Sequence, residues 1–140
     1  MLDIWSINMN KFVLIVVVLV LSISLDAFEN LKSLSQLKEH RFVFLVFEKN
    51  GCPWCIRYKN VLESGIIDKY GKEIKFFRAK KGTKISSQFR KKLGYKIIIY
   101  PMTYIFKSNK DKELELVDDI YGYQTEEYLE ELFQKQLLIK

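Results

Sequence analysis

Six consecutive apolar residues, Phe42 to Phe47, constrain the fold more than any other segment of this chain. The run is rich in β-branched and aromatic residues and is broken by Asn50-Gly51, so it predicts a strand that is buried on both faces. Such a strand needs a layer of structure on each side of its sheet. The run therefore favours an α/β protein with helices on both faces of the sheet.

Apolar residues recur at intervals of three and four in four segments, each of which predicts a helix. The helix that follows Pro53 is expected to reach about Glu63 and to be stopped by Gly65. Gly94 stands where a C′ glycine belongs, and Thr125 can cap the last helix. The four apolar faces are Leu31, Leu34 and Leu37; Cys55, Tyr58 and Leu62; Ile85, Phe89 and Leu93; and Tyr128, Leu129, Leu132, Phe133 and Leu137.

Four segments are expected to be strands, at residues 42–47, 74–77, 102–106 and 114–121. Strands separated by a helix predict parallel pairing, whereas the turn cluster at 108–111 predicts a hairpin and antiparallel pairing. The 140 residues provide room for one domain, and 49% of them are hydrophobic, which is enough for one core. We expect one α/β domain at 28–140, with a four-stranded mixed sheet flanked by helices.

An uncharged, mostly aliphatic run from Phe12 to Leu25 precedes this domain, between Lys11 and Asp26. Fourteen residues are few for a membrane span and suit the apolar core of an export signal. Residues 1–27 are therefore expected to be a signal peptide or, if they are not cleaved, an N-terminal anchor. A start at Met9 would give a more orthodox signal than a start at Met1. Both alternatives place residues 28–140 outside the cytoplasm.

The chain is basic, with a formal net charge of +6 at pH 7. Between Lys72 and Lys96, ten basic residues are opposed by Glu73 alone. Charge by itself would suit a nucleic-acid surface, an acidic partner or anionic lipid. Because an exported protein rarely meets nucleic acid, we expect no nucleic-acid partner, and a solvated basic face is the simplest interpretation.

The chemistry is expected at Cys52-Pro53-Trp54-Cys55, which follows the buried strand and opens a helix. Two thiols at this spacing can close a small disulfide ring, and the helix N-terminus stabilises a thiolate. Pro53 at the first helical position loses no hydrogen bond. We expect Cys52, at the N-cap, to be the exposed nucleophile and Cys55, one turn further, to be the more buried resolving thiol.

Other roles for the cysteine pair are less well supported. A zinc site would need a second cysteine pair, and His40 is the only histidine, so no metal or other cofactor is expected. A four-residue ring constrains the unfolded chain very little, so a purely stabilising disulfide is poorly motivated. A binding domain that holds a partner protein or a copper ion without turnover stays open. His40 is expected at the polar end of the first helix rather than in catalysis.

The strand, the Cys-Pro-Trp-Cys motif, the helix and the later Tyr100-Pro101-Met102-Thr103 resemble the thioredoxin superfamily over nearly all of residues 29–138. Three further segments are similar to exported bacterial thioredoxin-like proteins of the SoxW and thioredoxin-related type: residues 47–51, 61–63 and 121–123. The resemblance implies a monomeric periplasmic thiol–disulfide oxidoreductase that acts on protein disulfides, with a membrane electron donor. It also implies a cis peptide at Pro101 and substrate-binding roles for Pro53, Trp54, Tyr100 and Pro101.

The sequence also departs from the thioredoxin pattern. Val46 stands where thioredoxins carry a buried aspartate, and Glu48 is the nearest carboxylate that could accept a proton from Cys55. The dipeptide Pro-Trp does not set a reduction potential by itself, so the residues leave open whether the protein is a reductant or an oxidant. The resemblance favours a reductant. Three basic residues would stabilise the thiolate if they point towards it: Lys49, Arg57 and Lys59.

Overall fold

The computed structural model describes residues 11, 13 and 27–137. The expected signal peptide or anchor, residues 1–27, lies almost entirely outside these residues. In the part of the chain that is described, no helix combines the length and the apolar character that a membrane crossing requires.

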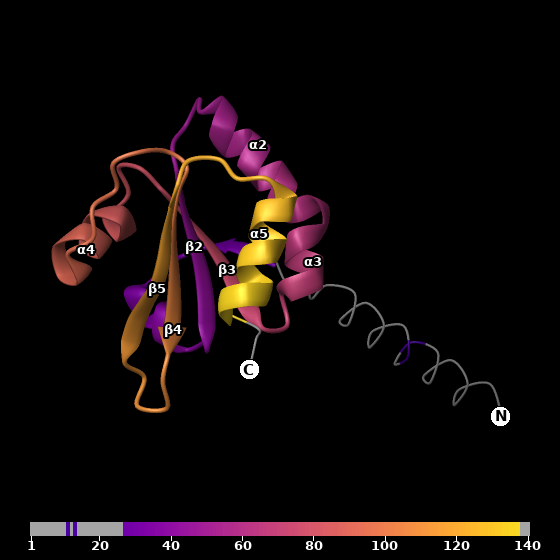
Figure 1. Ribbon diagram of the computed structural model, residues 1–140. Helices are drawn as coiled ribbons and strands as arrows, with labels where there is room; N and C mark the ends of the chain where they lie inside the picture. Colours follow the sequence, from indigo (N-terminus) through magenta and orange to yellow (C-terminus); the bar gives the residue numbers. More distant parts are fainter. Residues whose placement is uncertain (1–10, 12, 14–26, 138–140) are drawn as a thin grey trace.

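Five strands form one mixed sheet in the order β1-β3-β2-β4-β5 (Figure 1). β2 pairs in parallel with β3 and antiparallel with β4, and β4 forms a hairpin with β5. The expected change from parallel to antiparallel pairing is confirmed. The strands are β1 (Phe28–Asn30), β2 (Phe42–Glu48), β3 (Ile74–Lys80), β4 (Met102–Ser108) and β5 (Leu114–Tyr121).

The expectation of four strands is wrong, because β1 adds a fifth at one edge of the sheet. β1 has three residues, which pair in parallel with Phe76, Phe77 and Arg78 of β3. Three residues are too few to show the alternation by which a strand is identified. This segment is a strand because it pairs with the edge of β3, and its local sequence pattern does not predict a strand.

β2 is buried along its whole length, as the apolar run predicts. Its side chains alternate between two cores, with Phe42, Phe44 and Val46 in one and Val43, Leu45 and Phe47 in the other. On the first face lie α2 (Pro53–Val61), α3 (Ile67–Tyr70) and α5 (Glu126–Leu132), and on the second lie α4 (Lys84–Leu93) and the 3-10 turn η1 (Leu34–Lys38) (Figure 1).

Gly65 does not stop the helix that begins at Pro53. A π-helical turn, η2 (Leu62–Ile66), takes in Gly65 and leads directly into α3, which ends at Tyr70. The backbone at Gly65 is not helical, with φ 176° and ψ −32°. Leu62, Ile66 and Tyr70 are buried on both sides of this irregularity. The burial of these apolar side chains therefore stabilises helical structure on both sides of Gly65.

The helix caps agree with the sequence. Gly94 adopts φ 76° and donates its N–H to the carbonyl of Arg90, as a glycine beyond a helix end can. Thr125 Oγ1 accepts the N–H of Tyr128 at 3.3 Å. The last helix continues in a π-helical turn, η3 (Phe133–Leu137). Its apolar face was expected to include Tyr128, but that residue is 42% exposed. The buried face is formed by Leu129, Leu132, Phe133 and Leu137, and Tyr128 lies at its margin.

Replacement of Phe44 by alanine should cost about 3–5 kcal/mol of unfolding free energy. The Phe44 ring is fully buried against the rings of Phe76 and Phe133, with centroid distances of 5.2 and 5.5 Å. Urea denaturation measures the loss. Tyr128→Ala is the matched control and should change stability by less than about 0.5 kcal/mol. Equal losses in the two variants would contradict the assignment of Phe44 to the core.

Candidate active site

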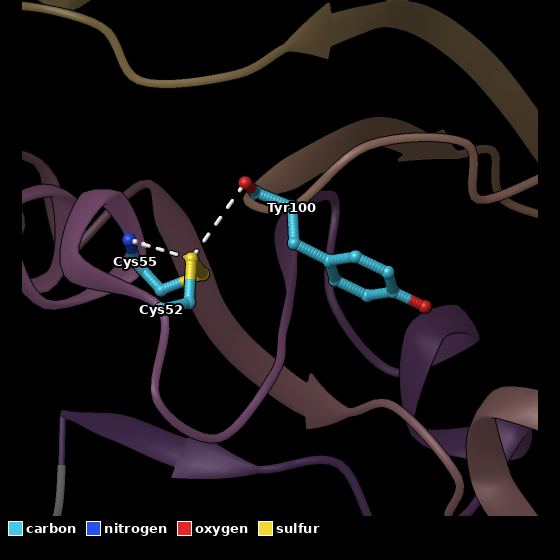
Figure 2. Close-up of a disulfide and its surroundings, with 3 residues drawn as sticks. All are labelled: Cys52, Cys55 and Tyr100. Atoms are coloured by element: carbon cyan, nitrogen blue, oxygen red, sulfur yellow. Dashed lines mark hydrogen bonds between the residues drawn. A yellow bond between two sulfur atoms is a disulfide. The ribbon is translucent and has the colours of Figure 1, made fainter.

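The segment Cys52-Pro53-Trp54-Cys55 joins β2 to α2. Gly51 turns the chain with φ 67°, Cys52 is the N-cap of α2, and Pro53 is its first residue. Cys52 and Cys55 form a disulfide, with their Cα atoms 5.2 Å apart (Figure 2). The expected placement of the motif at a helix start is confirmed.

The first turn of α2 directs a backbone donor at one of the two sulfurs. The N–H of Cys55 donates a hydrogen bond to Cys52 Sγ, with nitrogen and sulfur 3.2 Å apart (Figure 2). In the reduced protein this N–H and the helix dipole would stabilise a Cys52 thiolate. The local structure therefore favours Cys52 as the more acidic thiol.

Exposure does not separate the two cysteines, contrary to the expectation that Cys52 is the exposed one. Cys52 is 4% exposed and Cys55 is 5% exposed. The sequence could not show this, because Cys52 is covered by a segment 48 residues away along the chain. The two cysteines differ instead in their positions on α2, at the N-cap and in the first turn.

The covering segment is the loop that enters β4. The peptide bond between Tyr100 and Pro101 is cis, as the family resemblance implies. The carbonyl oxygen of Tyr100 lies 3.7 Å from Cys52 Sγ, and the Tyr100 ring is directed away from the disulfide (Figure 2). The structure therefore brings Tyr100 and Pro101 to the cysteine pair and presents main-chain atoms to the sulfur.

An apolar hollow of about 310 Å³ is lined in part by Tyr100, whose carbonyl oxygen lies 3.7 Å from Cys52 Sγ. Trp54, which is 53% exposed, and Tyr123 both line it, and their rings pack together with centroids 5.6 Å apart. Pro53 is exposed but does not line the hollow. Three lining residues were not predicted: Ile99, Gly122 and Tyr123. The sequence does contain one indication of Ile99, because the apolar run Ile97-Ile98-Ile99 lies outside every predicted helix and strand. The lining consists of Trp54, Ile99, Tyr100, Pro101, Gly122 and Tyr123.

A second hollow, of about 270 Å³, borders both cysteines. Of the three basic residues whose orientation the sequence left open, Lys49 and Lys59 line this hollow, whereas the guanidinium carbon of Arg57 lies 5.0 Å from the centroid of the Trp54 ring. Arg78 and Lys80 also line it and were not predicted, because β3 extends three residues beyond the expected strand. The lining consists of Glu48, Lys49, Asn50, Gly51, Cys52, Cys55, Ile56, Lys59, Arg78 and Lys80.

No family model and no curated protein sequence matches this chain. Solved structures of thioredoxins do match it. The Trichomonas vaginalis protein has a TM-score of 0.61 at 16% identity, covering 78% of this chain and 97% of its own. The Thermus thermophilus protein has a TM-score of 0.60 at 20% identity, covering 76% and 84%. Malassezia sympodialis thioredoxin (Mala s 13) has a TM-score of 0.58 at 19% identity, covering 78% and 90%. This chain has the thioredoxin fold.

Two buried hydroxyl groups, those of Thr103 on β4 and Tyr58 on α2, form a hydrogen bond in the interior behind the cysteine pair. Thr103 Oγ1, two residues after Pro101, donates to the hydroxyl oxygen of Tyr58 on α2 at 3.3 Å. Both residues are fully buried, and burial raises the pKa of Tyr58 well above its usual range. The hydrogen bond joins the helix that carries the cysteines to the strand that follows Pro101.

Other residues considered from the sequence lie away from the chemistry. His40 precedes β2, at the end of the strand opposite to the cysteines, and contacts Phe77 with ring centroids 5.9 Å apart. Burial is the main cause that lowers the pKa of His40. Val46 is buried in the apolar core. Glu48 is 8% exposed and shares the second hollow with Cys55.

The free energy of unfolding should fall as the pH rises above about 10, and Tyr58 should carry part of the fall. The folded state raises the pKa of Tyr58. The unfolded tyrosine ionises near 10, so the stability that Tyr58 contributes is complete below that pH and is lost above it. Tyr58→Phe should remove up to about 1.4 kcal/mol per pH unit from the decline. Urea denaturation from pH 9 to 11 measures it, and an unchanged slope would contradict the prediction.

Proposed function

We propose that this protein is a thiol–disulfide oxidoreductase that acts on protein disulfides through Cys52 and Cys55. One observation carries the proposal. The disulfide caps a helix N-terminus, and Cys52 Sγ lies 3.7 Å from a main-chain oxygen beside the cis peptide at Pro101. A redox-active sulfur is thereby placed next to backbone groups that an extended substrate segment can pair with. The fold shared with solved thioredoxins supports this assignment.

The proposed reaction in the reducing direction has two exchange steps. The Cys52 thiolate attacks one sulfur of a substrate disulfide, so a mixed disulfide forms, the substrate S–S bond breaks, and the departing thiolate takes a proton from water. Cys55, after losing its proton, attacks Cys52 Sγ and releases the second substrate thiol. Two electrons pass from the Cys52–Cys55 dithiol to the substrate. A dithiol donor of lower potential must then reduce the pair again.

We assign the positioning of the substrate to the groove around Pro101. The Tyr100 carbonyl faces the reacting sulfur, and the adjoining apolar hollow is large enough for one apolar side chain. Trp54, exposed on α2, forms one wall of that hollow. Pro53 fixes the first turn of α2 next to Cys52.

The cellular setting is also part of the proposal. We place the protein outside the cytoplasm, in the periplasm, as a monomeric reductant supplied with electrons from the membrane. The support is the apolar run from Phe12 to Leu25 and the similarity of residues 47–51 and 121–123 to exported bacterial thioredoxin-like proteins of the SoxW type. An export signal that is retained would tether the domain at the inner membrane.

The two cysteines should behave differently when each is replaced by serine. Cys55→Ser removes the resolving thiol, so the mixed disulfide with substrate proteins should accumulate. Cys52→Ser removes the nucleophile and should trap none. The two full-length variants are incubated with disulfide-containing protein substrates, and non-reducing electrophoresis measures the adducts. The same substrates after reduction and alkylation are the control and should give none. Equal trapping by both variants would contradict the assigned roles.

The reduction potential of the pair should lie near that of thioredoxin, about −270 mV, or below it. Trp54 lies between the cysteines in sequence, and its emission should report their oxidation during equilibration with dithiothreitol. A Trp5→Phe background leaves Trp54 as the single tryptophan. A potential near about −120 mV, as in DsbA, would make the protein an oxidant. No reversible transition, together with no reduction of insulin, would indicate a binding domain without turnover.

A further inference from the structure

The second hollow beside the disulfide is strongly basic. Its walls come from the loop between β2 and α2, the first turns of α2 and the end of β3. Four cationic side chains line it, Lys49, Lys59, Arg78 and Lys80, and Glu48 is the single carboxylate among its lining residues. The β2–β3 register sets Glu48 level with Lys80. The side chains that line the hollow therefore carry four formal positive charges and one negative charge at neutral pH.

Most of these cations form no salt bridge with the described part of the chain. Lys59 lies 3.8 Å from Glu63, and because both side chains are well exposed this pair contributes little. In the described part of the chain, neither Lys49, Arg78 nor Lys80 forms a salt bridge. Arg78 Nε is buried and has no hydrogen-bond partner, which is unusual for a buried donor. The guanidinium carbon of Arg78 lies 5.6 Å from the centroid of the Phe28 ring, and the buried Nε is out of reach of an incoming group. The hollow therefore offers cationic groups with which an incoming anion could pair.

Cations also flank the aromatic side chains of the neighbouring apolar hollow. The Nζ atoms of Lys49 and Lys81 each lie 5.8 Å from the centroid of the Tyr100 ring. The guanidinium carbon of Arg57 lies 5.0 Å from the centroid of the Trp54 ring. Cys52 lines the basic hollow, and its sulfur lies 3.7 Å from the carbonyl oxygen of Tyr100, a residue that lines the apolar hollow. A chain bound at Cys52 is therefore close to both hollows.

We infer that the substrates of this protein are disulfides in extended, acidic segments, in which an aspartate or glutamate lies within a few residues of the reacting cysteine. This inference rests on the proposed function. The carboxylate enters the hollow lined by Lys49, Arg78 and Lys80, and an apolar neighbour of the cysteine enters the hollow beside Trp54. Complementary charge of this kind accelerates encounter and selects among partners.

Three matched peptide disulfides test the inference with the reduced full-length protein. Each is a disulfide-linked dimer of one cysteine peptide, in which the cysteine is flanked by glutamate, by glutamine or by lysine. The second-order rate constant of reduction, followed by release of peptide thiol, should be about tenfold higher for the glutamate peptide than for the glutamine peptide. The lysine peptide should be slowest. In 1 M salt, where the screening length falls to about 3 Å, the three rates should converge.

A pair of charge-reversed variants locates the effect. Lys49→Glu combined with Lys80→Glu should abolish or reverse the preference for the glutamate peptide. Lys107→Glu combined with Lys110→Glu makes the same change of net charge at the opposite end of β4, at and beside the β4–β5 hairpin turn, and should retain the preference (Figure 1). Bis(2-hydroxyethyl) disulfide, which is uncharged and linear, reports any change at the Cys52 thiolate itself, so each peptide rate is divided by the rate with this disulfide. The ratio of the glutamate to the glutamine peptide, normalised in this way, should fall in the first variant and stay unchanged in the second.

Each other outcome counts against the inference in a distinct way. Equal rates for the three peptides at low salt would overturn it and leave the proposed function standing. A Lys49→Glu, Lys80→Glu variant that reduces all peptides and bis(2-hydroxyethyl) disulfide equally slowly would show that the cations act on the Cys52 thiolate and not on the substrate. Failure to reduce any peptide or bis(2-hydroxyethyl) disulfide would remove the proposed function, and the inference with it.

Discussion

The burial of β2 on both faces is the constraint on which the rest of the structure depends. Its alternating side chains need an apolar layer on each side, so helices must cover both faces of the sheet. The parallel pairing of β2 with β3 then requires a crossover, which α2 and α3 provide. Because α2 starts where β2 ends, the cysteine pair comes to lie at the carboxyl edge of the sheet. Core packing therefore places the chemistry.

The fold could be predicted where a local pattern and the core demand the same structure. The run at residues 42–47 and the helix that ends at Gly94 satisfy this condition. β1 could not be predicted, because three residues form a strand only in the presence of the open edge of β3. Gly65 is the opposite case: its local preference is to end a helix, and the buried side chains of Leu62, Ile66 and Tyr70 override it.

The candidate site divides in the same way. Cys52, Pro53 and Cys55 are neighbours in the chain, so their arrangement at a helix start follows from local sequence. Pro101 was placed by resemblance alone, since no local signal shows that it meets Cys52. Arg78 and Lys80 reach the cysteines only through the register of β3 on β2, a long-range property that residue spacing along one strand does not encode.

The buried hydrogen bond between Thr103 and Tyr58 makes the position of the disulfide independent of the residues that line the two hollows. It ties α2, which carries the disulfide, to β4, which follows Pro101, through groups that water does not reach. The distance from the sulfur to the groove is thus set in the interior, whereas the residues that line the two hollows lie on loops and strand ends. Substitutions there can therefore change the shape and charge of the two hollows, while the interior keeps the disulfide in place against Pro101.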